Sequence, residues 1–146
     1  MTPDAQKPGG GNDSGSTEEL SIRDGLDYAV IFNAVGNAMA FTERNSGKIL
    51  DVNAAWIRST GIGREKSLGK TALELGVWAK PAERQVCLAE LEKTGHVVDF
   101  EAELRMKSAE LPHLISGQRV EIGGKQYVLW EFRDIAEQKR LNKGLI

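Results

Sequence analysis

The chain has 146 residues, of which 40% are hydrophobic and 27% are charged, and its formal net charge is −2. This length and composition fit one globular domain with tails, and the charge gives no electrostatic case for nucleic-acid binding, which usually requires a basic patch or stripe. The single cysteine, Cys87, excludes an internal disulfide and a multi-cysteine zinc site. With only two histidines in addition, any other transition-metal site built by the protein is disfavoured.

The most apolar stretch, residues 28–41, is interrupted by Asn33, Gly36 and Asn37 and is too short to span a bilayer. The N-terminus lacks the basic start and apolar run of a signal peptide. We therefore expect a cytoplasmic setting and no membrane contact within these residues.

The first half of the chain predicts a tail, a helix, a hairpin and a second helix. Residues 1–18 are rich in Gly, Ser, Pro, Asp and Asn without apolar periodicity, which predicts a disordered tail or linker. Apolar spacing over residues 20–31 predicts a helix. Residues 38–42 and 48–52 predict short strands joined by a tight turn at residues 45–48. Asn53 is a favourable N-cap for a helix over residues 54–59.

The middle of the chain predicts two helices. Residues 71–74 have the capping-box form, with Thr71 at the N-cap and Glu74 three positions later, which predicts a short helix. Pro81 suits a first helical turn, and the helix that it opens is expected to run to Thr94 and to end at Gly95.

The last third predicts three strands and a final helix. From Val98 to Met106, apolar and charged residues alternate, which predicts a half-buried strand with Val98 and Phe100 on its apolar face. A turn at residues 107–110, a strand over 113–122, a hairpin at residues 123–124 and a strand over 126–133 follow. Residues 134–137 form a second capping box, which begins a charged C-terminal helix. Hairpin-length links indicate an antiparallel sheet with helices on one face, an α+β fold.

The segment from Gly63 to Thr71 resembles the phosphate-binding loop G-x-x-x-x-G-K-[ST], but five residues separate its glycines instead of four. That loop also follows a strand and opens a long helix, whereas here an expected helix precedes the glycines and Gly76 and Pro81 soon follow. A nucleotide-hydrolysing enzyme built on this segment is therefore the alternative and not the favoured interpretation.

Four segments together resemble the PAS domain family. Residues 28–41 are similar to its opening, residues 49–56 (ILDVNAAW) to its second strand and the helix after it, and residues 60–71 to its T-G-[YF]-x-x-x-E-x-x-G-[KR]-[TS] segment. Residues 133–139 (RDIAEQK) are similar to its closing R-D-I-T-E-R-K motif. The resemblance covers about residues 25–140. Ala136 stands where the family usually has threonine, and Ile62 where it commonly has Tyr or Phe.

The resemblance implies a five-stranded antiparallel sheet with short helices on one face and flanking helices at both ends. It divides the chain into a tail (1–18), a PAS sensor domain (19–133) and the start of a signalling helix (134–146). It also implies a non-catalytic sensory module of a larger bacterial signalling protein, a sensor histidine kinase, that binds a small ligand and relays a signal. A homodimer through the N- and C-terminal helices is expected, because these would otherwise expose Leu20, Ile22, Leu141 and Leu145. A ligand-free dimerisation scaffold is the alternative.

The candidate pocket residues lie where the helix cluster faces the sheet: Phe32, Met39, Trp56, Trp78, Cys87, Leu91, Phe100, Leu104 and Trp130. Apolar residues at helix and strand periods are usually core, so packing roles are the alternative for the aliphatic residues and phenylalanines. Both Trp56 and Trp78 suit a pocket rim, since a buried indole N–H needs a partner. Structural or signalling roles are expected for Asp51, Asn53, Glu65, Asp134 and Glu137.

The cofactor is unknown. The helix over residues 81–94 offers no axial histidine for haem, and His96 and His113 are expected to be half-exposed residues near strand starts. Residues 59–64 (STGIGR) do not match the N-C-R-F-L-Q motif of the flavin-photosensing branch, so photochemistry through a covalent flavin is not expected. Cys87 falls among apolar neighbours, where a thiol has no evident activation, so redox sensing through it is only a weak alternative.

Overall fold

The computed structural model describes residues 27–144. Among the described residues, 27–34 and 35–144 belong to two separate units, and each is described by itself. In the first unit residues 27–34 are helical, and the rings of Tyr28 and Phe32 stack with centroids 5.3 Å apart. The expected tail over residues 1–18, and Leu20, Ile22 and Leu145, lie outside the described residues.

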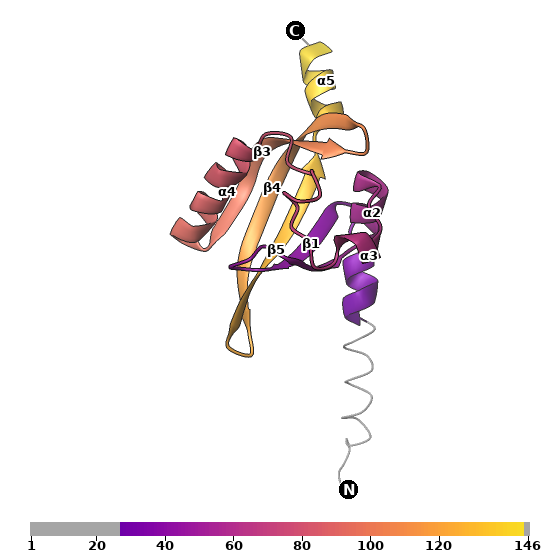
Figure 1. The fold of residues 1–146 in the computed structure, drawn as a ribbon. Helices are drawn as coiled ribbons and strands as arrows, with labels where there is room; N and C mark the ends of the chain where they lie inside the picture. Colours follow the sequence, from indigo (N-terminus) through magenta and orange to yellow (C-terminus); the bar gives the residue numbers. More distant parts are fainter. Residues whose placement is uncertain (1–26, 145–146) are drawn as a thin grey trace, which may run out of the picture. The chain divides into compact units, whose positions relative to one another are not determined.

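The second unit is built on the expected five-stranded antiparallel sheet (Figure 1). Its strand order is β2-β1-β5-β4-β3. Its strands are β1 (Ala38–Glu43), β2 (Ile49–Val52), β3 (His96–Met106), β4 (Ala109–Ile122) and β5 (Lys125–Asp134). Although β1 and β5 are far apart in the sequence, they pair at the centre, with Ala40 opposite Trp130 and Thr42 opposite Val128. This pairing joins the N-terminal hairpin to the C-terminal meander in one sheet.

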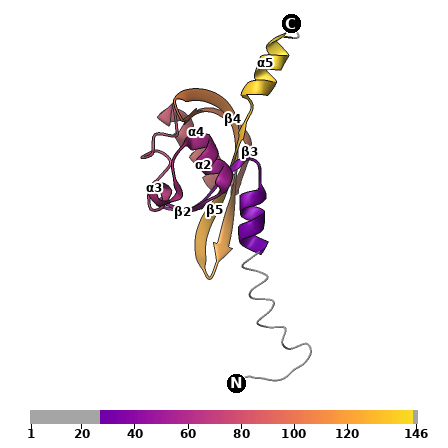
Figure 2. The same ribbon diagram turned by 90° about the vertical axis from the view of Figure 1, so that its right-hand side faces the viewer.

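Three helices lie on one face of this sheet (Figure 2): α2 (Ala54–Thr60), α3 (Arg64–Ser67) and α4 (Pro81–Thr94). Helix α2 begins at the predicted cap Asn53 and ends at Gly61, and α4 ends at Gly95; both glycines have left-handed backbone angles, φ 75° and 87°. The helix-covered face is apolar and forms the core with the helices. Its buried residues include Ala38, Ala40, Ile49, Val52, Trp56, Val77, Trp78, Cys87, Leu91, Val97, Ala102, Leu104, Met106, Ile115, Val128, Trp130 and Phe132.

The short helix predicted to start at Thr71 is wrong, because residues 72–76 form turns. Its capping box does form: the Thr71 N–H donates to Glu74 Oε1 (2.9 Å) and the Glu74 N–H donates to Thr71 Oγ1 (3.0 Å). Gly76, with φ 77°, ends the segment before a helical turn can repeat. The cap motif therefore closes a turn instead of starting a helix.

The predicted alternation along β3 fails at Val98, which is 68% exposed, while Val97 is buried. The pairing with β4 shifts between Val97 and Phe100, and Asp99 adopts φ 54° within this irregularity. An extra residue in one strand moves the side chains beyond it to the opposite face. Ala102, Leu104 and Met106 are buried as expected. Before the bulge, Val97 is therefore the buried residue and Val98 the exposed one.

The strand β4 begins earlier than predicted, because the turn before it is limited to Lys107 and Ser108. His113, expected to be half-exposed, is instead buried, with 2% of its surface exposed. Its Nδ1 lies 2.9 Å from the Leu111 carbonyl oxygen. His96 is exposed at the start of β3.

The last helix, α5 (Ala136–Gly144), continues directly from β5 and has no buried residues. The Ala136 N–H donates to Asp134 Oδ1 (2.8 Å), so Asp134 closes the turn into the helix. Lys139 Nζ lies 2.7 Å from Glu101 Oε2 on β3, which ties the helix to the edge of the sheet. Among residues 27–144, no helix is both long enough and apolar enough to cross a membrane.

Candidate functional site

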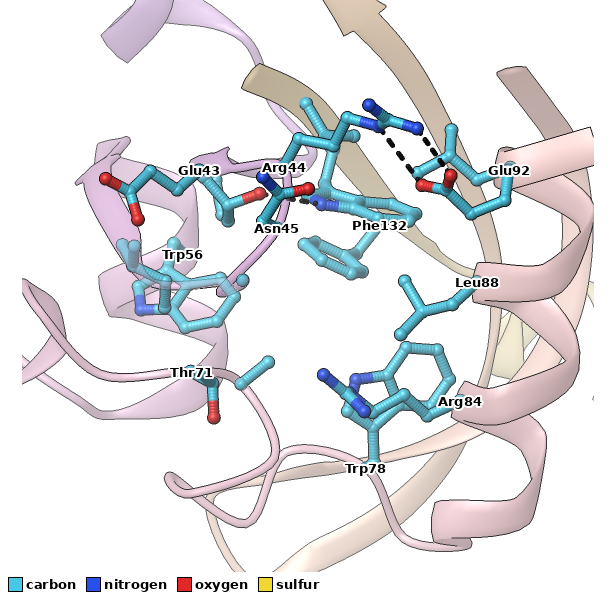
Figure 3. A pocket seen from close by; sticks show the side chains of 18 residues that line it. Glu43, Arg44, Asn45, Trp56, Thr71, Trp78, Arg84, Leu88, Glu92 and Phe132 are labelled. Atoms are coloured by element: carbon cyan, nitrogen blue, oxygen red, sulfur yellow. Dashed lines mark hydrogen bonds and ion pairs between the residues drawn. The ribbon is translucent and has the colours of Figure 1, made fainter. Parts of the chain in front are cut away.

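A cavity of about 330 Å³ lies between the helix-covered face of β1 and β5, the β1–β2 turn, Thr71–Ala72 and α4 (Figure 3). This volume is at the small end of the range of ligand pockets, roughly 300–1,000 Å³. The lining comprises Ala40, Thr42, Glu43, Arg44, Asn45, Gly47, Ile49, Trp56, Thr71, Ala72, Trp78, Arg84, Leu88, Leu91, Glu92, Val128, Trp130 and Phe132. It combines an apolar, aromatic interior with a few polar and charged groups, the composition typical of small-molecule sites.

Four of the candidate pocket residues line this cavity: Trp56, Trp78, Leu91 and Trp130. The others do not, for reasons of position. Met39 lies between the buried Ala38 and Ala40, so it faces the opposite side of the sheet. Cys87 and Leu104 are fully buried packing residues, Phe100 is half-buried beside the β3 bulge, and Phe32 lies on the helix over residues 27–34.

The sequence reasoning missed the charged and polar part of the lining. On α4, Arg84, Leu88, Leu91 and Glu92 follow one another at i, i+4, i+7 and i+8, the spacing of one helix face. The prediction for this helix considered only its apolar residues, although the helical period would have placed Arg84 and Glu92 on the same face.

Two of the cavity's three tryptophans have their indole N–H groups satisfied by the protein. Trp56 Nε1 donates to Ser67 Oγ (3.0 Å), and Trp130 Nε1 donates to Thr42 Oγ1 (3.2 Å). The rings of Trp56 and Phe132 are 5.8 Å apart at 55°, within the range of favourable tilted aromatic pairs. These contacts fix the apolar wall of the cavity.

Asn53 holds α2 against β1 and so positions Trp56. It is fully buried, and its Oδ1 accepts from the backbone N–H groups of Met39 (2.9 Å) and Trp56 (3.0 Å). Its Nδ2 donates to the Asn37 carbonyl oxygen (3.1 Å). One side chain thus caps the helix and joins it to the strand, the bracing role that the sequence predicts.

A charged cluster joins the β1–β2 turn to α4 at the cavity. The Arg44 guanidinium donates to both carboxylate oxygens of Glu92, at 3.2 and 2.5 Å, and to Gln126 Oε1 at 3.2 Å. The hydrogen bond from Arg44 lowers the pKa of the Glu92 carboxyl, with a smaller contribution from the charge of Arg119, whose Nη1 lies 4.0 Å away. Arg44 and Glu92 therefore neutralise each other.

The Gly63–Thr71 segment has no free phosphate cradle. The N–H groups of Ser67 and Leu68 donate to the carbonyls of Gly63 and Arg64, closing α3. The N–H of Gly69 donates to the Ile49 carbonyl, that of Lys70 to the Ser67 carbonyl, and that of Thr71 to Glu74. A phosphate loop needs such N–H groups to converge on its anion.

The remaining predicted structural residues differ in what they contact. Asp51 Oδ1 lies 2.9 Å from Arg64 Nε, an ion pair that holds α3 to β2. Glu137 pairs with Arg140 on the exposed surface of α5. Glu65 is exposed in the first turn of α3 and has no hydrogen bond or ion pair to any residue in the described part. The structural role expected for it stays a prediction.

Cys87 is a packing residue without activation. Its burial raises the pKa of the thiol to about 12, and the nearby Glu90 carboxylate adds to this rise. A thiol held in the protonated form is a poor nucleophile and metal ligand. Within residues 27–144, no group of three or more His, Cys, Asp or Glu side chains is arranged to hold a metal ion.

Comparison with known proteins gives matches at the level of structure. No protein-family model and no curated protein matches the sequence. The fold matches a PAS domain from a two-component sensor histidine kinase (TM-score 0.65, 18% identity), covering 80% of this chain and 98% of that one. It also matches the PAS domain of an HTR-like protein from Haloarcula marismortui (TM-score 0.64, 20% identity), covering 82% and 98% of the two chains.

A third match is the PAS domain of a protein from Colwellia psychrerythraea, with a TM-score of 0.65 and 18% identity, covering 80% of this chain and 98% of that one. These matches agree with the five-stranded antiparallel sheet, the helices on one face and the four sequence segments that resemble the family. At such identities a structural match establishes the fold. The chain has the PAS fold.

Proposed function

We propose that this chain is a sensory module of a larger bacterial signalling protein, a sensor histidine kinase, in which the cavity binds a small molecule and α5 carries the signal onward. The observation that supports this most is the continuity of β5 with α5. Val128, Trp130 and Phe132 of β5 line the cavity, and the same strand runs into α5 at Asp134.

The route from the cavity to α5 is short and made of specific contacts. Ile135, between β5 and α5, is buried, and its N–H donates to the Pro112 carbonyl oxygen (3.0 Å). One helical turn later, Lys139 pairs with Glu101 on β3. A ligand that packs against Trp130 or Phe132 would change the position of β5, and α5 would follow because it is anchored at both points. The ligand can shift the equilibrium between two positions of α5 only by as much as its affinities for the two differ.

Native mass spectrometry of the purified protein, with an absorption spectrum, tests ligand binding. We expect either a retained small molecule or binding from a panel of metabolites, detected as a discrete added mass. The variant that should block binding is Leu88→Trp, because Leu88 is half-buried on α4 and points into the cavity (Figure 3). Binding that persists in this variant would place the ligand elsewhere, and absence of any binding would favour the ligand-free scaffold.

We also propose that the module dimerises through its terminal helices, in the cytoplasm. Tyr28, Val30 and Ile31 on the 27–34 helix are 53%, 64% and 64% exposed, and Leu141 on α5 is 55% exposed. Exposed apolar residues gathered on helices are typical of association surfaces. Deleting residues 1–34, which removes the 27–34 helix with these exposed residues, is expected to shift the protein to monomer in light scattering. An unchanged mass would contradict this part of the proposal.

We expect no catalysis by this module. The alternative, nucleotide hydrolysis at residues 63–71, has little support because the backbone N–H groups from Ser67 to Thr71 already donate within the protein. Isothermal titration with ATP is expected to give no binding. Binding that Lys70→Ala abolishes would favour the enzyme instead.

A further inference from the structure

Two hydrogen-bond donors at the cavity have no acceptor among residues 27–144. Trp78 is 7% exposed and lines the cavity, and its Nε1–H makes no hydrogen bond to any residue in the range 27–144. The guanidinium of Arg84, half-buried on α4, has neither an ion pair nor a hydrogen bond within the same range. Both side chains lie at the same side of the cavity in Figure 3.

The other strong donors of the lining differ from this pair. The indole N–H groups of Trp56 and Trp130 reach Ser67 and Thr42, and the Arg44 guanidinium is held by Glu92. A buried donor left without an acceptor costs about 1–3 kcal/mol, so folded proteins rarely tolerate one. The Trp78 indole N–H is such a buried donor, and together with the half-buried Arg84 guanidinium beside it the pair indicates an acceptor that a ligand brings.

The framework holds both donors in place. Trp78 forms a β-bridge with Leu104, and the flanking bonds from the Arg105 N–H to the Val77 carbonyl (2.7 Å) and from the Ala79 N–H to the Glu103 carbonyl (3.3 Å) fix its backbone. Arg84 extends from α4 toward the β1–β2 turn. Its Nη2 is 3.7 Å from the position that a Cβ at Gly47 would take. The guanidinium thus spans from α4 to the turn, beside the indole.

We propose that the cavity binds a small organic carboxylate with an apolar body. The carboxylate accepts hydrogen bonds from Trp78 Nε1 and the Arg84 guanidinium, and the apolar body packs among Trp56, Leu88 and Phe132. The inference rests on the proposed ligand-binding function and names its ligand class. A carboxylate suits the planar fork of an arginine. The other lining cation, Arg44, is already neutralised by Glu92, and the Glu43 carboxylate lies on the opposite side of the cavity from Arg84 (Figure 3). The Arg84 guanidinium therefore provides charge for one carboxylate and not for a doubly charged phosphate.

Matched acids and amides test this inference: phenylacetate against phenylacetamide, and indole-3-acetate against indole-3-acetamide, by isothermal titration with the intact chain. Hydrogen bonds to charged groups are the stronger ones, so we expect the acids to bind about tenfold or more tightly than the amides. Arg84→Gln should remove this preference by weakening the acids alone. Arg84→Lys, which keeps the charge, should retain part of it, and Trp78→Phe should weaken the acids while keeping the ring.

The control is Arg58→Gln, because Arg58 is exposed on α2 and does not line the cavity. Circular dichroism verifies that each variant is folded. Equal binding of acids and amides, unaffected by Arg84→Gln but blocked by Leu88→Trp, would overturn the carboxylate and leave ligand binding standing. If no member of either series binds, the carboxylate inference is overturned, and native mass spectrometry of the purified chain decides separately whether the cavity holds any ligand.

Discussion

Gly117 on β4 lies directly against the indole ring of Trp130, its partner on β5. A Cβ built on Gly117 would lie 2.6 Å from Trp130 Cζ3 and 2.7 Å from Cε3. No real Cβ approaches a carbon so closely, and the atoms that it would meet belong to a rigid ring in the cavity wall. The absence of a side chain at position 117 therefore sets the depth at which Trp130 lies.

Gly117→Ala is expected to destabilise the protein and to move Trp130 into the cavity. Overpacking a core typically costs about 1–3 kcal/mol in the free energy of unfolding, measurable by urea denaturation with tryptophan fluorescence. Gly36→Ala is the control, since a Cβ there would meet nothing within 4 Å. If both variants had the same stability as the original protein, the close approach of Gly117 to Trp130 would be disproved.

Ser67→Ala is expected to cost about 1–3 kcal/mol, because it leaves the buried Trp56 N–H without an acceptor. The same substitution should cost less in a Trp56→Phe background, where that donor is gone. This double-mutant cycle, measured by chemical denaturation, separates the hydrogen bond from the packing. Ser108→Ala, in an exposed turn, is the control. Equal costs in the two backgrounds would mean that the hydrogen bond contributes nothing.

The pKa of the Glu92 carboxyl is expected to lie below the ordinary value of about 4.3 for a glutamate, because the hydrogen bond from Arg44 lowers it. A lowered pKa in the folded state stabilises the fold above the pKa of the unfolded chain. This contribution is lost as the pH falls through the lowered value. NMR titration should show the pKa of Glu92 rising in Arg44→Gln and unchanged in Arg58→Gln. If the pKa of Glu92 were the same in Arg44→Gln as in the original protein, this ion pair would be ruled out.

Cys87 is expected to react slowly with thiol reagents at pH 8, because burial holds the pKa of its thiol at about 12. Reaction with dithionitrobenzoate should be slow in the native protein and fast in urea, where the thiol becomes accessible. Rapid labelling under native conditions would show that Cys87 is more accessible and more acidic than its position on α4 implies. Redox sensing through Cys87 would then be supported.

The sequence was sufficient to predict the sheet and most of the helices, because their signals are local. Asn53 at an N-cap, Pro81 and Gly95 at the ends of a helix, and hairpin residues between apolar runs each act over a few positions. The two failures have different causes, one in contacts across the sheet and one in the residues that follow. The bulge at Asp99 that exposes Val98 arises from the pairing of β3 with β4, and Thr71 forms its cap without a helix because Gly76 follows.

The site was harder to predict than the fold. Apolar candidates such as Trp56 and Trp130 line the cavity, whereas Cys87 and Leu104, equally apolar, fill the core beside it. No local pattern distinguishes these two outcomes, since both follow from burial. What distinguishes Arg84 is that its neighbours leave it unpaired, and only the assembled structure reveals the partners of a side chain.

The central claim is that occupancy of the cavity changes α5, and hydrogen–deuterium exchange over residues 136–144 tests it most directly. The Leu88→Trp variant, whose indole is expected to fill the cavity, and the original protein with a bound ligand should both alter exchange in α5 relative to the empty protein. Protection of the lining strand β5 would verify occupancy in each sample. Unchanged exchange over residues 136–144, with β5 protected, would contradict the account.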